Sequence, residues 1–168
     1  GAYPHEIDTA VEAFGFPMGP FAVSDLAGLD IGLARRKRLE PTRDKRVRYV
    51  NTLADRLCEQ GRLGQKTGAG WYRYEGGQRL IDPDVTAMIE AFWKEKGTLH
   101  VPLDGDALMC RVRAVMVNEG ARILEEGIAA RALDIDIVEI KGFGYPAWRG
   151  GPMFEADQIG VAAILSDM

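Results

Sequence analysis

The chain has 168 residues, of which 46% are hydrophobic and 27% charged, and its formal net charge is −4. This composition is typical of a globular protein, and the length allows one domain or two small ones. The acidic balance argues against a general nucleic-acid-binding protein, and no apolar run approaches the length of a membrane span. The two cysteines, Cys58 and Cys110, are expected to be small core residues, so no metal site is predicted.

The first predicted element is a helix over residues 7–14, where apolar residues recur at helical spacing. Pro17 and Pro20 then predict a stiff, extended connection, because each proline fixes its own φ and disfavours helix in the preceding residue. Ser24-Asp25 is a typical helix cap, so a second helix is expected to begin at Leu26 and to run to Leu39.

A run of basic residues follows. Such runs are usually solvated helix faces, and the alternative is a site for an anionic ligand or an acidic partner. The run comprises Arg35, Arg36, Lys37, Arg38, Arg43, Lys45, Arg46 and Arg48. Asp44 can cap a further helix that ends at Gly61.

Residues 61–70 contain four glycines and precede an aromatic stretch, Trp71 to Tyr74. This pattern predicts a loop that leads into at most one small hairpin near residues 71–80. The loop neither follows a buried strand nor opens a helix, so it does not meet a nucleotide-binding fingerprint. A plain turn and a phosphate contact through Lys66 remain the alternatives.

Helical patterns dominate the rest of the chain. Asp82-Pro83 predicts a helix start, with an end near Gly97, and the longest helix is expected over residues 106–126. Asp134 can cap the next helix, and the last helix is expected to follow Gly160. Since no alternation suits a parallel sheet, the sequence predicts an all-α fold.

One motif occurs twice. The first copy is Ile7-Asp8, Gly15-Phe16-Pro17, Gly19-Pro20, Asp25 and Gly28, and the second is Ile135-Asp136, Gly144-Tyr145-Pro146, Gly151-Pro152, Asp157 and Gly160. A repeat of this length indicates a duplicated structural unit. A long helix precedes the second copy but not the first, so we expect the chain to be part of a larger protein.

Three stretches carry a resemblance to the 3-hydroxyacyl-CoA dehydrogenase family. Residues 7–32, IDTAVEAFGFPMGPFAVSDLAGLDIG, resemble the opening of that family's C-terminal helical domain, and residues 61–74, GRLGQKTGAGWYRY, resemble the segment that closes it. Residues 117–137, VNEGARILEEGIAARALDIDI, and residues 142–160, GFGYPAWRGGPMFEADQIG, resemble the second, degenerate copy found in multifunctional fatty-acid β-oxidation enzymes.

The resemblance implies two tandem helical repeats packed as a pseudo-dimer, with the fold of the 6-phosphogluconate dehydrogenase C-terminal domain. The expected boundaries are residues 1–75 for the first repeat, 76–105 for a connector with one helix, and 106–168 for the second repeat. The leading helix of the first repeat and the C-terminal end of the second are expected to be missing.

The resemblance also implies a function for the parent protein, which is oxidation of (3S)-hydroxyacyl-CoA to 3-ketoacyl-CoA with NAD. The NAD site and the catalytic His-Glu pair of the family lie in a Rossmann domain with no counterpart here. A supporting asparagine of the family belongs to the leading helix that the first repeat is expected to lack, and the matching positions of the second copy read Cys110-Arg111, so the asparagine is not regained there. No catalytic or cofactor-binding residue is therefore expected in this chain, which alone should be inactive.

The substrate-binding residues expected from the resemblance are those of the first turn, where the family places the acyl chain. They are Phe16, Pro17, Met18, Gly19 and Pro20. The alternative, from the residues alone, is that this stiff turn only packs helix against helix. The expected partners are the upstream Rossmann domain, the acyl-CoA substrate and a second copy of the chain, with no nucleic acid.

Two other hypotheses for the function stay open at this point. One is a non-catalytic helical dimerisation module, and the other is the same domain of a related 3-hydroxy-acid dehydrogenase. We expect a bacterial cytoplasmic location for the parent protein, with peroxisomal and mitochondrial locations as alternatives.

Overall fold

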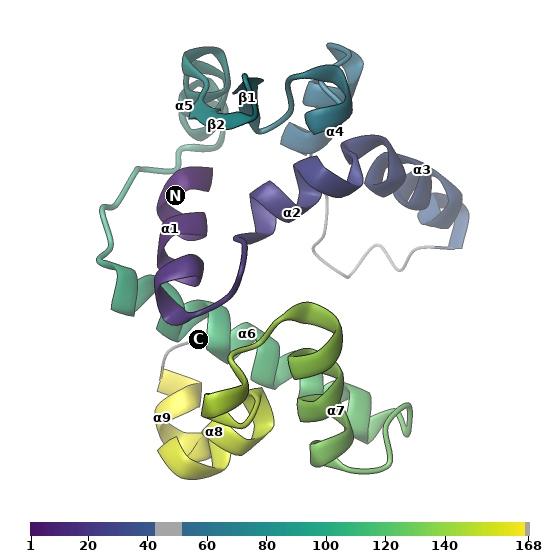
Figure 1. Ribbon diagram of the computed structural model, residues 1–168, viewed down its shortest axis with the longest axis vertical. Helices are drawn as coiled ribbons and strands as arrows, with labels where there is room; N and C mark the ends of the chain where they lie inside the picture. The colour runs from purple at the N-terminus through teal and green to yellow at the C-terminus, as the bar shows by residue number, and fades with distance from the viewer. Residues whose placement is uncertain (43–51, 167–168) are drawn as a thin grey trace. The chain divides into compact units, whose positions relative to one another are not determined.

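The computed structural model describes residues 1–42 and 52–166. Within these ranges helices dominate, and a small antiparallel hairpin is the one sheet (Figure 1). The α-helices are α1 Pro4–Phe14, α2 Pro20–Ala27, α3 Leu29–Leu39, α4 Thr52–Glu59, α5 Pro83–Lys96, α6 Gly105–Glu125, α7 Ala132–Val138, α8 Pro152–Ile159 and α9 Val161–Ser166. The strands are β1 Tyr72–Glu75 and β2 Gln78–Ile81. The expected all-α class and the small hairpin are both confirmed.

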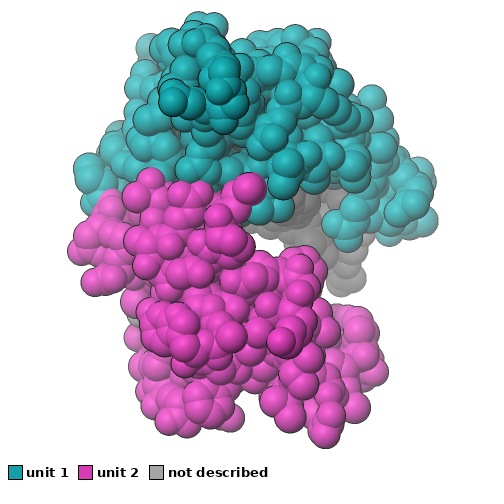
Figure 2. All heavy atoms as spheres, in the orientation of Figure 1, with its two compact units in different colours: residues 1–8, 20–102 teal, residues 9–19, 103–168 magenta. Residues whose placement is uncertain are grey.

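The chain divides into two compact units, coloured separately in Figure 2. Unit 1 comprises residues 1–8 and 20–102, and unit 2 comprises residues 9–19 and 103–168. Helix α1 contributes its first residues to unit 1 and the remainder, with the following turn, to unit 2.

Unit 1 contains the start of α1, helices α2 to α5 and the hairpin. Strands β1 and β2 pair with Tyr72 opposite Ile81 and Glu75 opposite Gln78. The most deeply buried apolar residues of the unit come from the helices and from the start of the hairpin, and they include Leu57, Trp71, Tyr72, Val85 and Ile89. Alternation along the strand puts Tyr72 on the buried face and leaves Arg73 exposed.

Helix α5 begins and ends as its sequence predicts. Asp82 is the N-cap, and its carboxylate accepts a hydrogen bond of 2.9 Å from the backbone N–H of Asp84. Pro83 occupies the first helical position, where its missing N–H costs no helical bond. Gly97 ends the helix in the left-handed conformation, with φ +63°.

The predicted start of the second helix at Leu26 is wrong. Helix α2 begins at Pro20 and already contains Asp25, and Gly28 with φ +103° separates it from α3. The cap prediction failed because the Asp25 side chain is buried and accepts bonds from distant backbone instead of from its own helix. Asp134 is likewise in the first turn of α7 rather than its N-cap, which is Arg131.

Unit 2 is built on the long helix α6, which begins at its N-cap Asp104. Ala114 of α6 forms a buried cluster with Ala156 of α8 and Ile164 of α9. Gly120 of α6 lies so close to α8 that an added Cβ would be 2.5 Å from the Met153 sulfur. Small residues on α6 therefore let the shorter helices approach its backbone.

No helix within residues 1–42 and 52–166 has the length and apolar character required to cross a membrane.

Candidate functional site

The repeated Ile-Asp pair positions the helix that follows each turn. Asp8 is fully buried in unit 1, and its two carboxylate oxygens accept the backbone N–H groups of Phe21 and Ala22, each at 2.9 Å. These two donors lie in the first turn of α2, where backbone N–H groups have no partner within the helix. The carboxylate at this end also interacts favourably with the helix dipole.

Asp136 repeats the arrangement in unit 2. Its oxygens accept the N–H groups of Met153 at 2.7 Å and Phe154 at 3.2 Å, in the first turn of α8. The approach is so close that a Cβ on Gly151 would lie 2.4 Å from the Asp136 side chain. The sequence shows the paired Ile-Asp and Gly-Pro motifs, but the capping role that joins them emerges only from the structure.

Burial dominates the electrostatics of both capping carboxylates and raises the pKa of Asp8 and of Asp136 above the ordinary Asp value. The hydrogen bonds from the helix amides oppose this rise in each case. Asp8 gains two further partners, the Tyr72 hydroxyl at 2.8 Å and the Arg79 guanidinium at 3.7 Å. Each carboxylate therefore fixes the first turn of the helix that it caps.

The third repeated residue differs between the copies. Asp25 is 1% exposed and accepts hydrogen bonds from the N–H groups of Trp71 at 2.9 Å and Tyr72 at 3.0 Å, and from the Tyr74 hydroxyl at 3.0 Å. Its counterpart Asp157 is exposed. Asp25 thus anchors the glycine loop and the hairpin, whereas Asp157 accepts no such buried bonds from the described residues.

The predicted substrate-binding residues form the turn between α1 and α2. Phe16 and Met18 are half-buried, Pro17 and Pro20 are exposed, and Gly19 is buried. The Gly19 N–H donates to the Glu12 carboxylate at 3.1 Å, which fixes the turn to the preceding helix. The structure therefore gathers the five residues in one ordered turn, and contact with an acyl chain stays a prediction.

The first turn packs against its duplicate within unit 2. An added Cβ on Gly15 would lie 2.9 Å from Pro146, and one on Gly144 would lie 2.8 Å from Pro17. The two contacts are reciprocal, since each turn presents its proline to the glycine of the other. Reciprocal contacts of this kind are typical of a two-fold interface between like surfaces.

The second copy is one residue longer than the first between its aspartate and its glycine, that is, from Asp136 to Gly144 against Asp8 to Gly15. In this interval the chain forms a π-helical turn, Glu139–Phe143. A π-helical turn holds one more residue than an α-helical turn, so it absorbs the extra residue without displacing Asp136 or the turn.

Two of the cations predicted as alternative anion contacts pair with acidic side chains of the chain itself. Lys66 lies 2.5 Å from the Asp30 carboxylate, and Arg36 pairs with Asp55. Arg35, Lys37 and Arg38 are exposed, as expected of a solvated helix face. The predicted helix start at Asp44 and the cations Arg43, Lys45, Arg46 and Arg48 lie outside the described residues.

The two histidines lie in one aromatic cluster of unit 1. The ring of Tyr3 lies 5.5 Å from that of His5 and 4.8 Å from that of His100, and Trp93 stacks on His100 at 5.4 Å. His100 Nε2 also lies 3.0 Å from the Glu6 carboxylate. The cluster ties α1 to the segment after α5, and among residues 1–42 and 52–166 no group of side chains could hold a metal ion.

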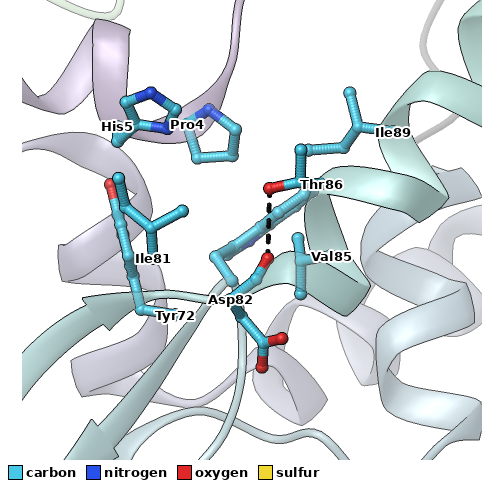
Figure 3. A pocket seen from close by; sticks show the side chains of 9 residues that line it. Pro4, His5, Tyr72, Ile81, Asp82, Val85, Thr86 and Ile89 are labelled. Atoms are coloured by element: carbon cyan, nitrogen blue, oxygen red, sulfur yellow. Dashed lines mark hydrogen bonds between the residues drawn. The ribbon is translucent and has the colours of Figure 1, made fainter.

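A small cavity lies beside the hairpin in unit 1 (Figure 3). Nine residues line it, and its free volume of about 10 Å³ corresponds to a single water molecule. The Thr86 hydroxyl, on one wall, donates to the Asp82 carbonyl at 3.1 Å. A cavity of this size is too small for an acyl chain.

Comparison with known proteins gives a family-model match for the N-terminal part of the chain. Residues 1–74 match the family model described as 3-hydroxyacyl-CoA dehydrogenase, C-terminal domain. The human peroxisomal bifunctional enzyme is 39% identical over an alignment of 181 positions, gaps included, which covers the whole chain and 25% of that protein. The peroxisomal fatty acid beta-oxidation multifunctional protein of Oryza sativa is 36% identical over 96% of the chain and 23% of its own length. The chain thus spans about a quarter of these relatives.

Solved structures agree in fold. The dehydrogenase part of multifunctional enzyme 1 from C. elegans aligns with 87% of the chain and 32% of its own, with a TM-score of 0.67 and 29% identity. The 3-hydroxybutyryl-CoA dehydrogenase of Escherichia coli aligns with 99% of the chain and 50% of its own, with a TM-score of 0.71. Its identity of 22% makes it evidence for the fold alone.

Proposed function

We propose that the chain is the C-terminal helical region of a multifunctional β-oxidation enzyme, on the premise that residues 1–74 match the model of the 3-hydroxyacyl-CoA dehydrogenase C-terminal domain. The observation that carries the proposal is the similarity to bifunctional enzymes along the whole chain, well beyond residue 74. The parent enzyme would oxidise (3S)-hydroxyacyl-CoA with NAD.

In this proposal NAD is held by an upstream Rossmann domain, and the present chain supplies no catalytic group. Its two capping aspartates hold α2 and α8 in place, and the turn between α1 and α2 presents an apolar wall to the acyl chain. Phe16, Pro17 and Met18 supply the apolar surface of that wall, while Gly19 and Pro20 fix its backbone. The half-buried state of Phe16 and Met18 supports this role, because part of each side chain stays accessible.

The relatives bear names that place them in peroxisomes, and they come from animals and plants. These names favour a peroxisomal parent and give no support to the bacterial cytoplasmic location that we expected. Fractionation of source cells with an antibody against this chain would decide the compartment.

The test combines activity with a change in the turn. The parent enzyme should form NADH from 3-hydroxyacyl-CoA thioesters but not from the free acids, and the 168-residue chain alone should form none. Met18→Trp should raise KM for a long-chain thioester about tenfold and leave a four-carbon thioester unchanged, because a bulky ring would narrow the acyl wall. Val161→Trp, on an exposed position of α9, is the control and should change neither. Equal KM values for the Met18→Trp variant and the control would contradict the proposal that the turn contacts the acyl chain.

A second function, a helical association module, is favoured by one observation. Val23 and Leu26 of α2 and Ile31 of α3 are 47%, 58% and 62% exposed. Large apolar side chains that gather on a surface are typical of interaction sites. We propose that a second copy of the chain covers this surface of unit 1.

A further inference from the structure

The second copy of the motif contains three residues that the first copy lacks, Ala147-Trp148-Arg149, directly after its Gly-Tyr-Pro turn. They form a short 3₁₀ turn that ends at Gly150 with φ +87°. Trp148 is 76% exposed, whereas Arg149 is half-buried. Because the Trp148 ring is mostly exposed, it contributes little to a hydrophobic core. Its position is better explained by the partner on which it packs.

That partner is the Arg149 guanidinium, which lies over two aromatic rings, those of Phe14 and Trp148. Its carbon atom is 3.7 Å from the centre of the Phe14 ring and 4.3 Å from the Trp148 ring. A guanidinium placed over a ring face is attracted by the ring's electron density, and the flat shape of the group allows it to stack on both sides. The Arg149 Nε is buried and finds no hydrogen-bond partner among the described residues, which fits a group held through its faces.

The edge of the guanidinium is fixed by Glu155. Arg149 Nη1 donates to Glu155 Oε1 at 2.9 Å, and the Tyr145 hydroxyl donates to Glu155 Oε2 at 2.6 Å. Burial and the neighbouring Glu155 carboxylate raise the pKa of Tyr145, so the hydroxyl stays protonated and keeps donating. One carboxylate therefore connects the stacked arginine to the tyrosine of the second turn.

The aromatic contacts extend from this cluster to the first turn. Tyr145 meets the rings of Phe14 at 5.7 Å and Phe16 at 5.3 Å, both edge to face, and Phe14 stacks on Phe16 at 6.0 Å. Arg149 joins these aromatic contacts because its guanidinium lies over the Phe14 ring. Phe14 and Phe16 flank Gly15, so their rings hold the turn at its first residue.

We propose that Arg149 is a positioning residue for the turn of residues 15–20, acting through Phe14 and Phe16. The proposal rests on the proposed function, because it gives the second copy a task at the acyl wall that the first copy supplies. In this proposal the insertion Ala147-Trp148-Arg149 holds the turn of residues 15–20 in one conformation and does not itself contact the substrate.

The test of the positioning role uses the 168-residue chain. Hydrogen exchange is followed at the Phe16 and Gly19 amides, which donate to the Val11 carbonyl at 3.3 Å and to Glu12 at 3.1 Å. Arg149→Lys keeps the charge but loses the planar group, and should lower the protection of these amides about tenfold. Arg131→Lys is the matched control, since Arg131 also pairs with a carboxylate in unit 2, at 2.6 Å from Asp134, but stacks on no ring among the described residues.

Trp148→Ala is the second variant, because a side chain this exposed can be removed without loss of the fold. It should lower protection at Phe16 and Gly19 in the same direction and by a smaller factor, since one of the two stacked rings remains. The Tyr72 amide of unit 1 should be unchanged in every variant. Unaltered protection at Phe16 and Gly19 in both Arg149→Lys and Trp148→Ala would overturn the positioning role.

The same variants separate this inference from the proposed function. In the parent enzyme, Arg149→Lys should raise KM for a long-chain 3-hydroxyacyl-CoA severalfold while kcat for a four-carbon thioester stays constant. A looser turn accompanied by this KM change supports both. A looser turn with every KM unchanged would leave the positioning role standing and overturn the proposal that the turn faces the acyl chain.

Discussion

Gly144 meets two constraints at the residue scale. Its φ is +79°, a conformation that side-chain-bearing residues rarely adopt, and a Cβ there would lie 2.8 Å from Pro17. Gly127 has a similar φ of +69°, yet its added Cβ would meet nothing within 4 Å. Gly127→Ala should therefore cost about 1–2 kcal/mol from backbone strain alone, and Gly144→Ala about 1–3 kcal/mol more from the clash. Urea denaturation of the two variants measures the difference, and equal losses would show that the reciprocal turn contact does not form.

Asp25 and Asp157 give a second comparison at the residue scale, because they occupy the same place in the two copies. Asp25→Asn leaves one oxygen to serve three donors and turns an NH₂ group toward the others, which should cost about 2–4 kcal/mol. Asp157 is exposed, so Asp157→Asn should stay within about 0.5 kcal/mol of the unsubstituted chain. Trp71 fluorescence during denaturation reports on unit 1, and a mild Asp25→Asn would contradict an anchoring role.

At the scale of the element, the N-cap of α5, Asp82, should make the free energy of unfolding of unit 1 depend on pH in acid. Burial raises the pKa of the Asp82 carboxyl, but the bonds from Arg62 and from the Asp84 N–H outweigh burial, so the pKa lies below its ordinary 3.8. A lowered pKa means that the folded state holds the proton less tightly than the unfolded state, so the stabilisation is complete above pH 3.8 and lost as the pH falls further. Asp82→Asn should lower the free energy of unfolding by about 2 kcal/mol at neutral pH. The gap in stability between this variant and the unsubstituted chain should close in acid. A gap that stays constant down to pH 2 would contradict this origin.

The elements also show which parts of the fold could be predicted from sequence. The start and end of α5 were predictable because Asp82-Pro83 and Gly97 act on their own helix. The start of α2 was not, because its cap is Asp8, which lies 13 residues before Phe21 in the chain. The partners of Asp25 lie 46 and 47 residues away, so its sequence context indicated a local cap that the fold does not use.

For the candidate site the division is similar. The stiff turn of residues 16–20 and its duplicate are both visible in the sequence, because glycines and prolines recur at fixed spacing. The packing of one turn on the other was not visible, since it joins Pro17 to a glycine 127 positions away. The stacking of Arg149 on Phe14 has no sequence signal beyond the three inserted residues.

At the scale of the whole molecule, we expect the isolated chain to self-associate through the exposed surface of α2 and α3. Sedimentation velocity should show a mass that rises with concentration, because Val23, Leu26 and Ile31 leave large apolar area in contact with water. Leu26→Gln should weaken the association, whereas Leu133→Gln, a similarly exposed position of unit 2, should not. A monomer at every concentration would contradict the prediction.

The π-helical turn at Glu139–Phe143 bears on how the two copies diverged after duplication. The two copies differ by one residue between the capping aspartate and the turn, and the helix of the second copy accommodates this difference. The turn could not lengthen there, because Gly144 and Pro146 are each held by a residue of the other copy. We therefore expect the interlocked turns to tolerate length changes only in the helix before them and in the segment after them, and an alignment of homologous sequences should place its gaps at those points.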